Sequence, residues 1–291
     1  MDMTEAAAVL RQQCVDDFGE AIGGSLAAMA TPGFELTDAA PDRPRTGSCR
    51  FGGSALLEPG TVWPEYEGLP LSLFAVLDTG ALAHWSGEHH GPGPRLLNIF
   101  YFETPDDSFR PAQWSPWEGW ADPRVGDAKA SCAVIAARPE RAEEAHTPEM
   151  ATVFPSTPQH AAPMLMTPDE WDDALGYLDL HAIPEFAAAS AFERDHPESF
   201  LSRHFRCGPG RLVRPDGDGE DPGPSSAIAF GWPRSLSGGT YTDGGRDRPL
   251  LQLPTNDLWS WSEGGSVHII LPGEDLAAGD YTEAAAYVDG W

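Results

Sequence analysis

Short apolar runs separated by glycine- and proline-rich turns recur along the chain, and this pattern predicts strands. Most of the runs are rich in aliphatic, β-branched or aromatic side chains, which suit a half-buried or buried sheet. They span residues 71–77, 96–102, 131–137, 227–230, 250–253, 267–271 and 282–288. The last three follow one another with turn residues and one helical turn at Asp275 between them. We therefore expect this C-terminal unit to be central to the sheet.

Apolar residues at helical spacing predict one long helix over residues 4–30, closed by Thr31-Pro32-Gly33. Its expected apolar face consists of Val9, Cys14, Phe18, Ile22 and Leu26. A single helix of this length is only marginally stable without tertiary contacts. We therefore expect it to pack on the sheet.

Residues 138–164 are charged and then rich in proline and threonine, which predicts a long surface connection. Thr167 and Glu170 then have the spacing of a capping box and predict a second helix. Its expected apolar face is Trp171, Leu175 and Leu178. A further helical stretch is expected over residues 185–205, divided or kinked at Pro197.

Many strands with few helices, and no Rossmann fingerprint, predict a mainly β protein with peripheral helices, an α+β fold. We expect a mixed or antiparallel, roll-like β core with the N-terminal helix packed on it. Residues 1–47 are assigned to the helix and a linker, and residues 48–291 to the β-rich domain. The two segments are expected to form a single structural unit.

The chain carries 45 acidic and 18 basic residues, a formal net charge of −27. Such a charge repels nucleic acid and anionic membranes, so we expect neither as a partner. It permits a basic protein partner or a cationic ligand, although solubility is the simpler explanation of the acidity. The acidic N-terminal residues lack the positive segment of a signal peptide, and no apolar run approaches a membrane span. The sequence therefore predicts a cytoplasmic protein.

Candidate metal and thiol chemistry is weak throughout the sequence, and we expect no metal and no cofactor. The four cysteines are scattered, without the close pairs of a zinc site. His84, His89 and His90 lack metal-ligand spacing and are assigned to a surface loop. The acidic run 216–221 lacks the glycine and glutamate of an EF-hand, which favours a solvated loop over a calcium site.

A loop with tryptophans at three-residue spacing, Trp114, Trp117 and Trp120, has two interpretations. It is either an aromatic clamp for a sugar, cation or proline-rich peptide, or a hydrophobic cluster that fixes a long loop to the sheet. Both interpretations remain open at the level of the sequence.

Several motifs occur in one order along residues 48–291. They are Phe51-Gly52-Gly53, Trp63-Pro64, the strand Leu69–Asp78, the strand after Gly93, Gly231-Trp232-Pro233, and Leu250-Leu251-Gln252-Leu253 followed by Asp257 and Trp259. In this order they resemble the YwqG-like family of domains of unknown function. Val76 replaces the glutamine of the family strand, and Trp261-Ser262-Glu263 replaces Trp-Gly-Asp. The resemblance implies a mostly β, roll-like architecture with added helices and no established activity.

The favoured function is a non-enzymatic protein-binding module, which would neutralise a basic partner such as a toxin. The alternatives are a small-molecule-binding protein or a hydrolase that uses an aromatic-lined pocket. Candidate hydrolase groups such as His268 and Glu263 show no triad spacing. Because sites gather where strands end in turns, six residues are expected to contribute to binding. They are Trp63, Asp78, Trp232, Asp257, Trp259 and Trp261.

Overall fold

The computed structural model describes residues 1–87, 91–102, 131–169, 172–195, 212–215, 226–235, 246–261 and 264–290. Its α-helices are α1 (Met3–Ala28), α2 (Thr79–Ser86), α4 (Pro184–Ala187), α5 (Ala191–Asp195) and α7 (Gly273–Ala278), and its 3-10 helices are η2 (Asp173–Tyr177) and η3 (Leu180–Ala182). Its strands are β1 (Thr31–Asp38), β2 (Arg50–Phe51), β3 (Leu56–Leu57), β4 (Glu65–Tyr66), β5 (Leu69–Pro70), β6 (Ser72–Asp78), β7 (Leu96–Tyr101), β8 (Cys132–Ala137), β9 (Glu143–Glu144), β10 (Thr157–Met166), β11 (Leu212–Val213), β12 (Ala227–Phe230), β13 (Asp247–Pro254), β14 (Ser266–Pro272) and β15 (Ala285–Asp289).

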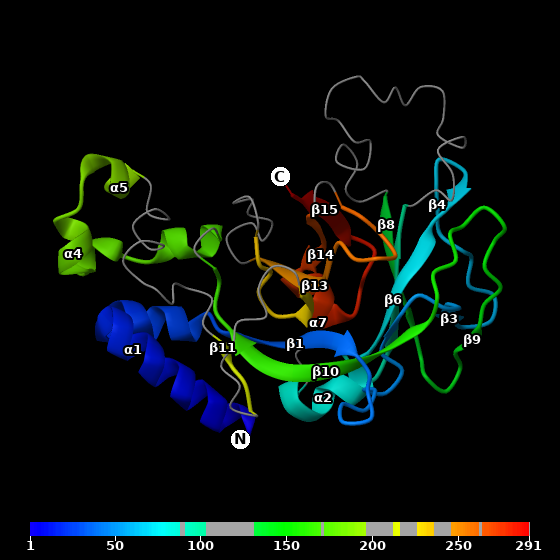
Figure 1. Cartoon of the computed structure of the whole chain (residues 1–291), viewed down its shortest axis with the longest axis horizontal. Coiled ribbons are helices and arrows are strands. Elements are labelled where there is room, and N and C mark those ends of the chain that lie inside the picture. The colour runs from blue at the N-terminus through cyan, green and yellow to red at the C-terminus, as the bar shows by residue number, and fades with distance from the viewer. Residues whose placement is uncertain are drawn as a thin grey trace.

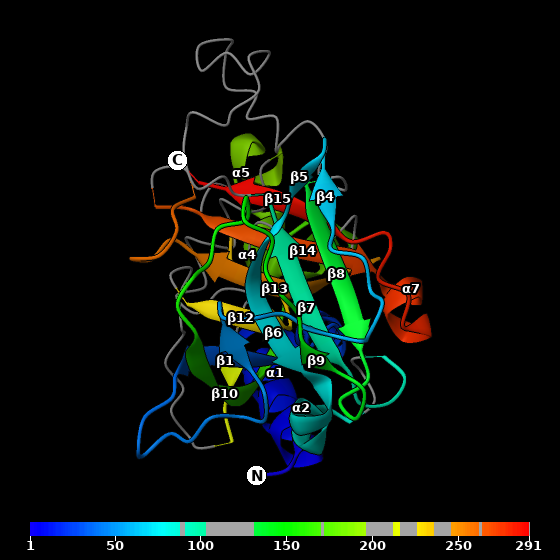
Figure 2. The ribbon, with the colours of Figure 1, turned by 90° about the vertical axis from the view of Figure 1, so that its right-hand side faces the viewer.

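One large antiparallel sheet organises the described part of the chain. Its strands follow the order β15-β14-β13-β12-β1-β10-β2-β6-β7-β8, and β11 pairs with β10 beside this path. The outermost strands, β15 and β8, contact each other, so the sheet curves into a nearly closed barrel (Figure 1, Figure 2). The prediction of a mainly β, α+β fold with a roll-like core and a packed N-terminal helix is confirmed.

Aromatic side chains fill the interior of this barrel. The ring of Phe74 lies 4.8 Å from that of Phe154, 5.2 Å from that of Trp259 and 5.3 Å from that of Trp261, measured between centroids. Tilted and edge-on aromatic pairs of this kind stabilise a core beyond the area they bury. Two of the tryptophans expected in a binding site therefore belong to the main core.

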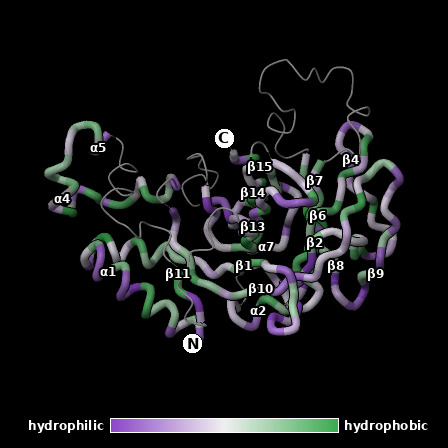
Figure 3. Tube along the Cα trace, in the orientation of Figure 1, coloured by the Kyte–Doolittle hydropathy of each residue, from purple (hydrophilic) through white to green (hydrophobic). Residues whose placement is uncertain are grey.

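Strands β6 and β7 are buried on both faces, which explains their almost uninterrupted apolar sequences. Their second face is covered by residues 55–71, where Ala55, Leu57 and Leu71 pack against Leu73 and Phe100. Hydrophobic residues accordingly run along these strands in Figure 3. The predicted strands at 71–77, 96–102 and 131–137 correspond to β6, β7 and β8.

Two strands at the centre of the sheet, β1 and β10, were not predicted. Residues 157–166 form the ten-residue strand β10, so the prediction of a surface connection over 138–164 is wrong there. Residues 31–38 lie in the segment assigned to a helix and linker, yet they form β1 between β10 and β12. Strand β10 contains a proline within this ladder, since Pro163 lies opposite Phe34 of β1.

The N-terminal helix is real, but its buried face differs from the prediction by one position. Val9 is 38% exposed, whereas Leu10 is 1% exposed and packs with Cys14, Ile22 and Leu26. Non-helical angles at Gly19, with φ of 75°, divide α1 into two helical halves, and the buried positions 10, 14, 18, 22 and 26 keep a four-residue spacing through both halves. No helix in the described ranges is long and apolar enough to cross a membrane.

The predicted helix at Thr167 starts later than expected. Residues 167–169 are not helical, and the 3-10 helix η2 begins at Asp173, with Asp172 accepting a hydrogen bond from Ala174 N at 2.8 Å. Leu175 and Leu178 are nevertheless buried, as predicted. In the described part of 185–205, the short helices α4 and α5 replace one longer helix.

Candidate functional site

The six residues expected to bind do not gather at one place. Trp63 lies in the cluster that covers the outer face of β6 and β7, and Trp259 and Trp261 lie in the barrel core. Trp232 belongs to a third cluster with Met164 and Met166 on β10. The tryptophans therefore do not form a common aromatic pocket.

The structure gives several of these six residues clear local roles. Trp63 donates its indole N–H to the Leu71 carbonyl at 2.8 Å and meets the ring of Phe100 edge-on. Asp78 caps α2, since its Oδ1 accepts from Ala81 N at 3.1 Å and its Oδ2 from Ser48 N at 3.0 Å. These contacts tie loops and a helix to the sheet.

The connection between β13 and β14 presents Asp257 and Leu258 to solvent. Trp259 donates its indole N–H to the Pro254 carbonyl at 2.9 Å and is buried, as is Trp261. Asp257 is exposed and Leu258 is 37% exposed. The two tryptophans thus anchor a turn whose tip carries one acidic and one apolar side chain.

Trp232, one of the expected residues, lines a substantial cavity. The cavity has a volume of about 650 Å³ and lies between the start of α1, the start of β1, the end of β12 and α7. Its lining is mostly apolar, with Thr4, Thr31 and Arg248 as the polar members. Pockets for small molecules typically have about 300–1,000 Å³ and few polar groups, so both size and lining suit a small ligand.

The floor of this cavity is backbone held in an unusual conformation. Phe230 has φ of 55° and Gly231 has φ of 70°. A left-handed conformation is a genuine outlier for a bulky residue such as phenylalanine, and strain of this kind concentrates at functional sites. Trp232 then donates its indole N–H to the Met29 carbonyl at 2.9 Å, which locks the turn against the end of α1.

Buried polar side chains fix the chain immediately beyond the cavity floor. Gln252 Oε1 accepts from Arg234 N at 2.7 Å, and Asp169 Oδ2 accepts from Ser235 N at 2.8 Å. Gln252 is the glutamine of the motif that resembles the YwqG-like family, and it is 1% exposed. Its position on β13 thus gives that motif a structural role, because it holds the chain that follows the Gly231-Trp232-Pro233 turn.

A serine, an aspartate and a histidine meet beside this segment, and the described hydrogen bond of the serine hydroxyl goes to the aspartate rather than to the histidine. Ser235 Oγ donates to Asp289 Oδ2 at 3.1 Å, and His268 Nε2 lies 3.7 Å from the same oxygen. A serine nucleophile requires its hydroxyl to bond the base, and here it bonds a carboxylate. Along β14, His268 and its neighbours Val267 and Ile269 lie on opposite faces of the strand, as their alternation predicts. His268 pairs with Gln252 on β13.

The described cysteines are buried thiols. Cys14, Cys49 and Cys132 are buried, and burial raises the pKa of both Cys49 and Cys132 to about 12. A thiol with so high a pKa is protonated near neutral pH and a poor nucleophile. Within the described ranges no cluster of three or more His, Cys, Asp and Glu side chains is arranged to hold a metal ion.

Other candidates have a mixed placement. His84 lies in α2 rather than in a loop, which corrects that expectation. Several candidates lie outside the described residues: His89, His90, Trp114, Trp117, Trp120, the run 216–221, Cys207 and Glu263.

Sequence reasoning missed most of the cavity wall. Phe230, Leu165 and Arg248 line it, as do Met3 and Ala7 of α1. These residues are far apart in the chain and carry no shared motif. The Gly231-Trp232-Pro233 turn was the single local signal that pointed to this place.

Comparison with curated proteins gives no match. The family model described as "Domain of unknown function (DUF1963)" matches residues 49–289, well over half of the chain. YwqG-like domains are members of this family, so the resemblance seen in the motifs is confirmed. The matched range includes the cavity floor at Phe230–Trp232 and the motif with Gln252, but not α1 or β1. The chain belongs to the DUF1963 family of domains of unknown function.

Proposed function

We propose that this protein binds a small, largely apolar molecule in the cavity floored by Phe230, Gly231 and Trp232. The observation that carries the proposal is the coincidence of a cavity of about 650 Å³ with a strained aromatic backbone at its floor. Strain persists only where the surroundings hold it in place, and it costs stability that selection for stability alone would remove.

The chemistry of the wall indicates the kind of ligand. Phe230, Trp232, Leu165 and Leu276 offer apolar and aromatic surface, and Arg248 contributes a cationic side chain. An apolar ligand body gains about 25 cal/mol for each Å² removed from water.

The experiment uses 1-anilinonaphthalene-8-sulfonate, an aromatic anion whose fluorescence rises in apolar sites. We expect saturable binding to the native protein and loss of binding in Ala7→Trp, because Ala7 lines the cavity and a tryptophan there would fill it. Ala8→Trp is the matched control, since Ala8 is also exposed on α1 but does not line the cavity. Equal probe binding by the two variants would refute the cavity as the site.

The second candidate is the capture of a basic protein partner, such as a toxin, by an acidic surface. The net charge of −27 favours it, because complementary charge accelerates association. The exposed tip with Asp257 and Leu258, anchored by Trp259 and Trp261, is the place we propose for the contact.

An affinity pull-down from the host lysate at low and high salt tests this second function. We expect a basic protein that binds at low salt, is released at high salt, and is lost when Asp257→Asn is combined with Leu258→Ser. Glu149→Gln serves as the control because Glu149 is exposed elsewhere on the surface. Retention of the same protein by the double variant would exclude this tip as the contact.

A further inference from the structure

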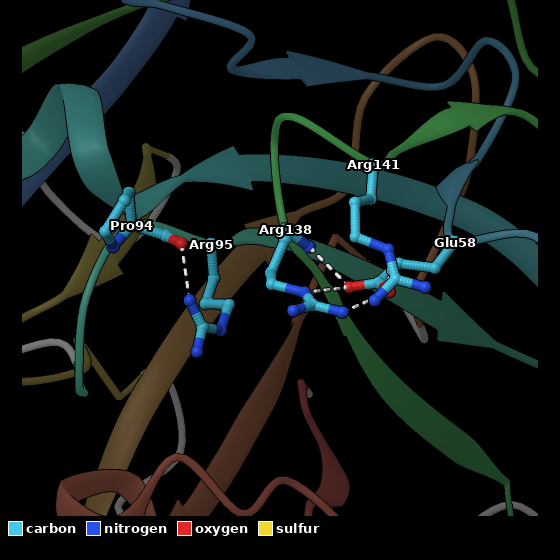
Figure 4. A network of polar contacts seen from close by, with 5 residues as sticks. All are labelled: Glu58, Pro94, Arg95, Arg138 and Arg141. Atoms are coloured by element: carbon cyan, nitrogen blue, oxygen red, sulfur yellow. Dashed lines mark hydrogen bonds and ion pairs between the residues drawn. The ribbon is translucent and has the colours of Figure 1, made fainter.

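Three arginines gather at one end of the β7–β8 ladder in a chain that has far more acidic than basic residues. The ladder ends with the pair Leu96 and Ala137, so Arg95 and Arg138 follow at the same end on neighbouring strands. Arg141 lies in the turn after β8, where its N–H bonds the Arg138 carbonyl at 2.9 Å. Figure 4 shows Arg138 and Arg141 at one glutamate, and Arg95 on the other side of Arg138 beside Pro94.

The glutamate, Glu58, is fully engaged by two of the arginines. Its Oε1 accepts from Arg138 Nε at 3.0 Å and from Arg138 N at 3.1 Å, and its Oε2 accepts from Arg138 Nη2 at 3.1 Å. Arg141 Nε lies 3.2 Å from the same Oε2. Both carboxylate oxygens are therefore saturated, which leaves Glu58 little capacity for a third arginine.

Arg95 is the arginine without a carboxylate. Among the described contacts, its side chain donates only to the neighbouring Pro94 carbonyl, at 2.8 Å from Nη1. In the part of the chain that the structure describes, Glu58 is the single carboxylate in ion-pair contact with any of the three arginines. Arg95 therefore contributes a guanidinium charge that no carboxylate within the described ranges meets in an ion pair.

The backbone holds these charges close together. Arg95 N–H donates to Thr79 Oγ1 at 2.8 Å, and Thr79 N–H donates to the Arg95 carbonyl at 2.9 Å. Arg138 is fixed by the ladder and by Glu58. Like charges at facing positions destabilise a sheet. A bound anion would remove this repulsion between Arg95 and Arg138.

We propose that Arg95, Arg138 and Arg141 bind the dianionic phosphate group of a small phosphate monoester. Guanidinium groups match phosphate oxygens through paired N–H donors, and a phosphate monoester carries nearly two negative charges near neutral pH. The site is separate from the apolar cavity and stands without the function proposed for it.

The test is isothermal titration calorimetry with inorganic phosphate near neutral pH, at about 0.15 M ionic strength to limit the repulsion from the net charge. We expect Arg95→Ala to weaken phosphate binding about tenfold or more, because it removes a charge-assisted contact. Arg43→Ala, an exposed arginine in another loop, is the control and should bind like the wild type.

The variant Glu58→Gln provides an independent test, because it should change the affinity for phosphate in the opposite direction from Arg95→Ala. The substitution removes the negative charge of the Glu58 carboxylate, while the amide oxygen of glutamine still accepts hydrogen bonds from Arg138 and Arg141. Phosphate should therefore bind to this variant more tightly than to the wild type. Acetate at equal ionic strength should bind more weakly than phosphate. Equal affinity of Arg95→Ala and wild type, weaker binding by Glu58→Gln, or equal binding of acetate and phosphate would overturn the proposal.

Discussion

At the scale of single residues, the cavity floor depends on a glycine that no other residue replaces at low cost. A Cβ on Gly231 would lie 2.7 Å from Met166 Sδ and 3.0 Å from the Gly33 Cα, and φ there is 70°. We expect Gly231→Ala to lower the free energy of unfolding by about 2–5 kcal/mol, from backbone strain and overpacking together. Urea unfolding followed by fluorescence measures it.

Gly60→Ala is the matched control for this change. Gly60 has φ of 84°, but a Cβ there would meet nothing within 4 Å. It should therefore cost only the conformational penalty of about 1–2 kcal/mol. Equal losses in the two variants would show that contact with Met166 and Gly33 does not matter.

The buried cysteines make a second prediction at this scale. Because burial raises the pKa of Cys49 and Cys132 to about 12, both thiols stay protonated at mildly alkaline pH. In a Cys207→Ser variant, which leaves three buried thiols, an aromatic disulfide reagent should react slowly with the folded protein. After denaturation all three should react. Rapid reaction of the folded variant would contradict this.

The sequence predicted one residue of the cavity, Trp232, from its glycine–proline turn. It could not predict that Trp232 bonds Met29 or that α1 closes the cavity, because these contacts join distant parts of the chain. Trp259 and Trp261 looked like binding residues for the same reason as Trp232. Their turn packs against the aromatic side chains of the core. Only tertiary packing therefore distinguishes these two core tryptophans from Trp232, which lines the cavity.

At the scale of elements, α1 should be stabilised by a face centred on Leu10 rather than Val9. Leu10 is 1% exposed, so Leu10→Ala should cost about 2–5 kcal/mol of unfolding free energy. Val9→Ala, at a position 38% exposed, should change it by about 0.5 kcal/mol or less. Chemical denaturation of both variants measures the difference, and similar losses would disprove the assigned face.

Strands with continuous apolar sequence, such as β6 and β7, were predictable because burial on both faces demands it. Strand β10 was not predictable, because Pro158 and Pro163 are typical of loops and its polar residues interrupt the apolar pattern of a strand. It forms because β1 and β2 pair with it on either side. Strand pairing outweighs the low local propensity of these residues for a strand. The same explanation holds for β1, which the sequence also failed to predict.

At the scale of the whole molecule, the net charge of −27 predicts a stability that rises with salt. Self-repulsion destabilises the compact state, and the screening length falls from about 30 Å at 0.01 M salt to about 10 Å at 0.1 M. We expect the melting temperature to increase over this range, equally in sodium and potassium chloride. A flat or falling melting temperature by calorimetry would contradict it.

The position of β1 in the sheet has a consequence for the order in which the protein is made. β1 is the first strand to leave the ribosome, yet it pairs with β10 and β12, which follow much later. At ordinary translation rates Gly33 waits roughly 10 to 40 s for Phe230. The edge that pairs with β10 stays open until residues 157–166 are made, and the edge that pairs with β12 stays open until residues 227–230 are made, so nascent chains halted before residue 157 should be cleaved by protease at β1. The sheet therefore closes around β1 only after residues 227–230 have been made, and protection of β1 in the halted chains would show otherwise.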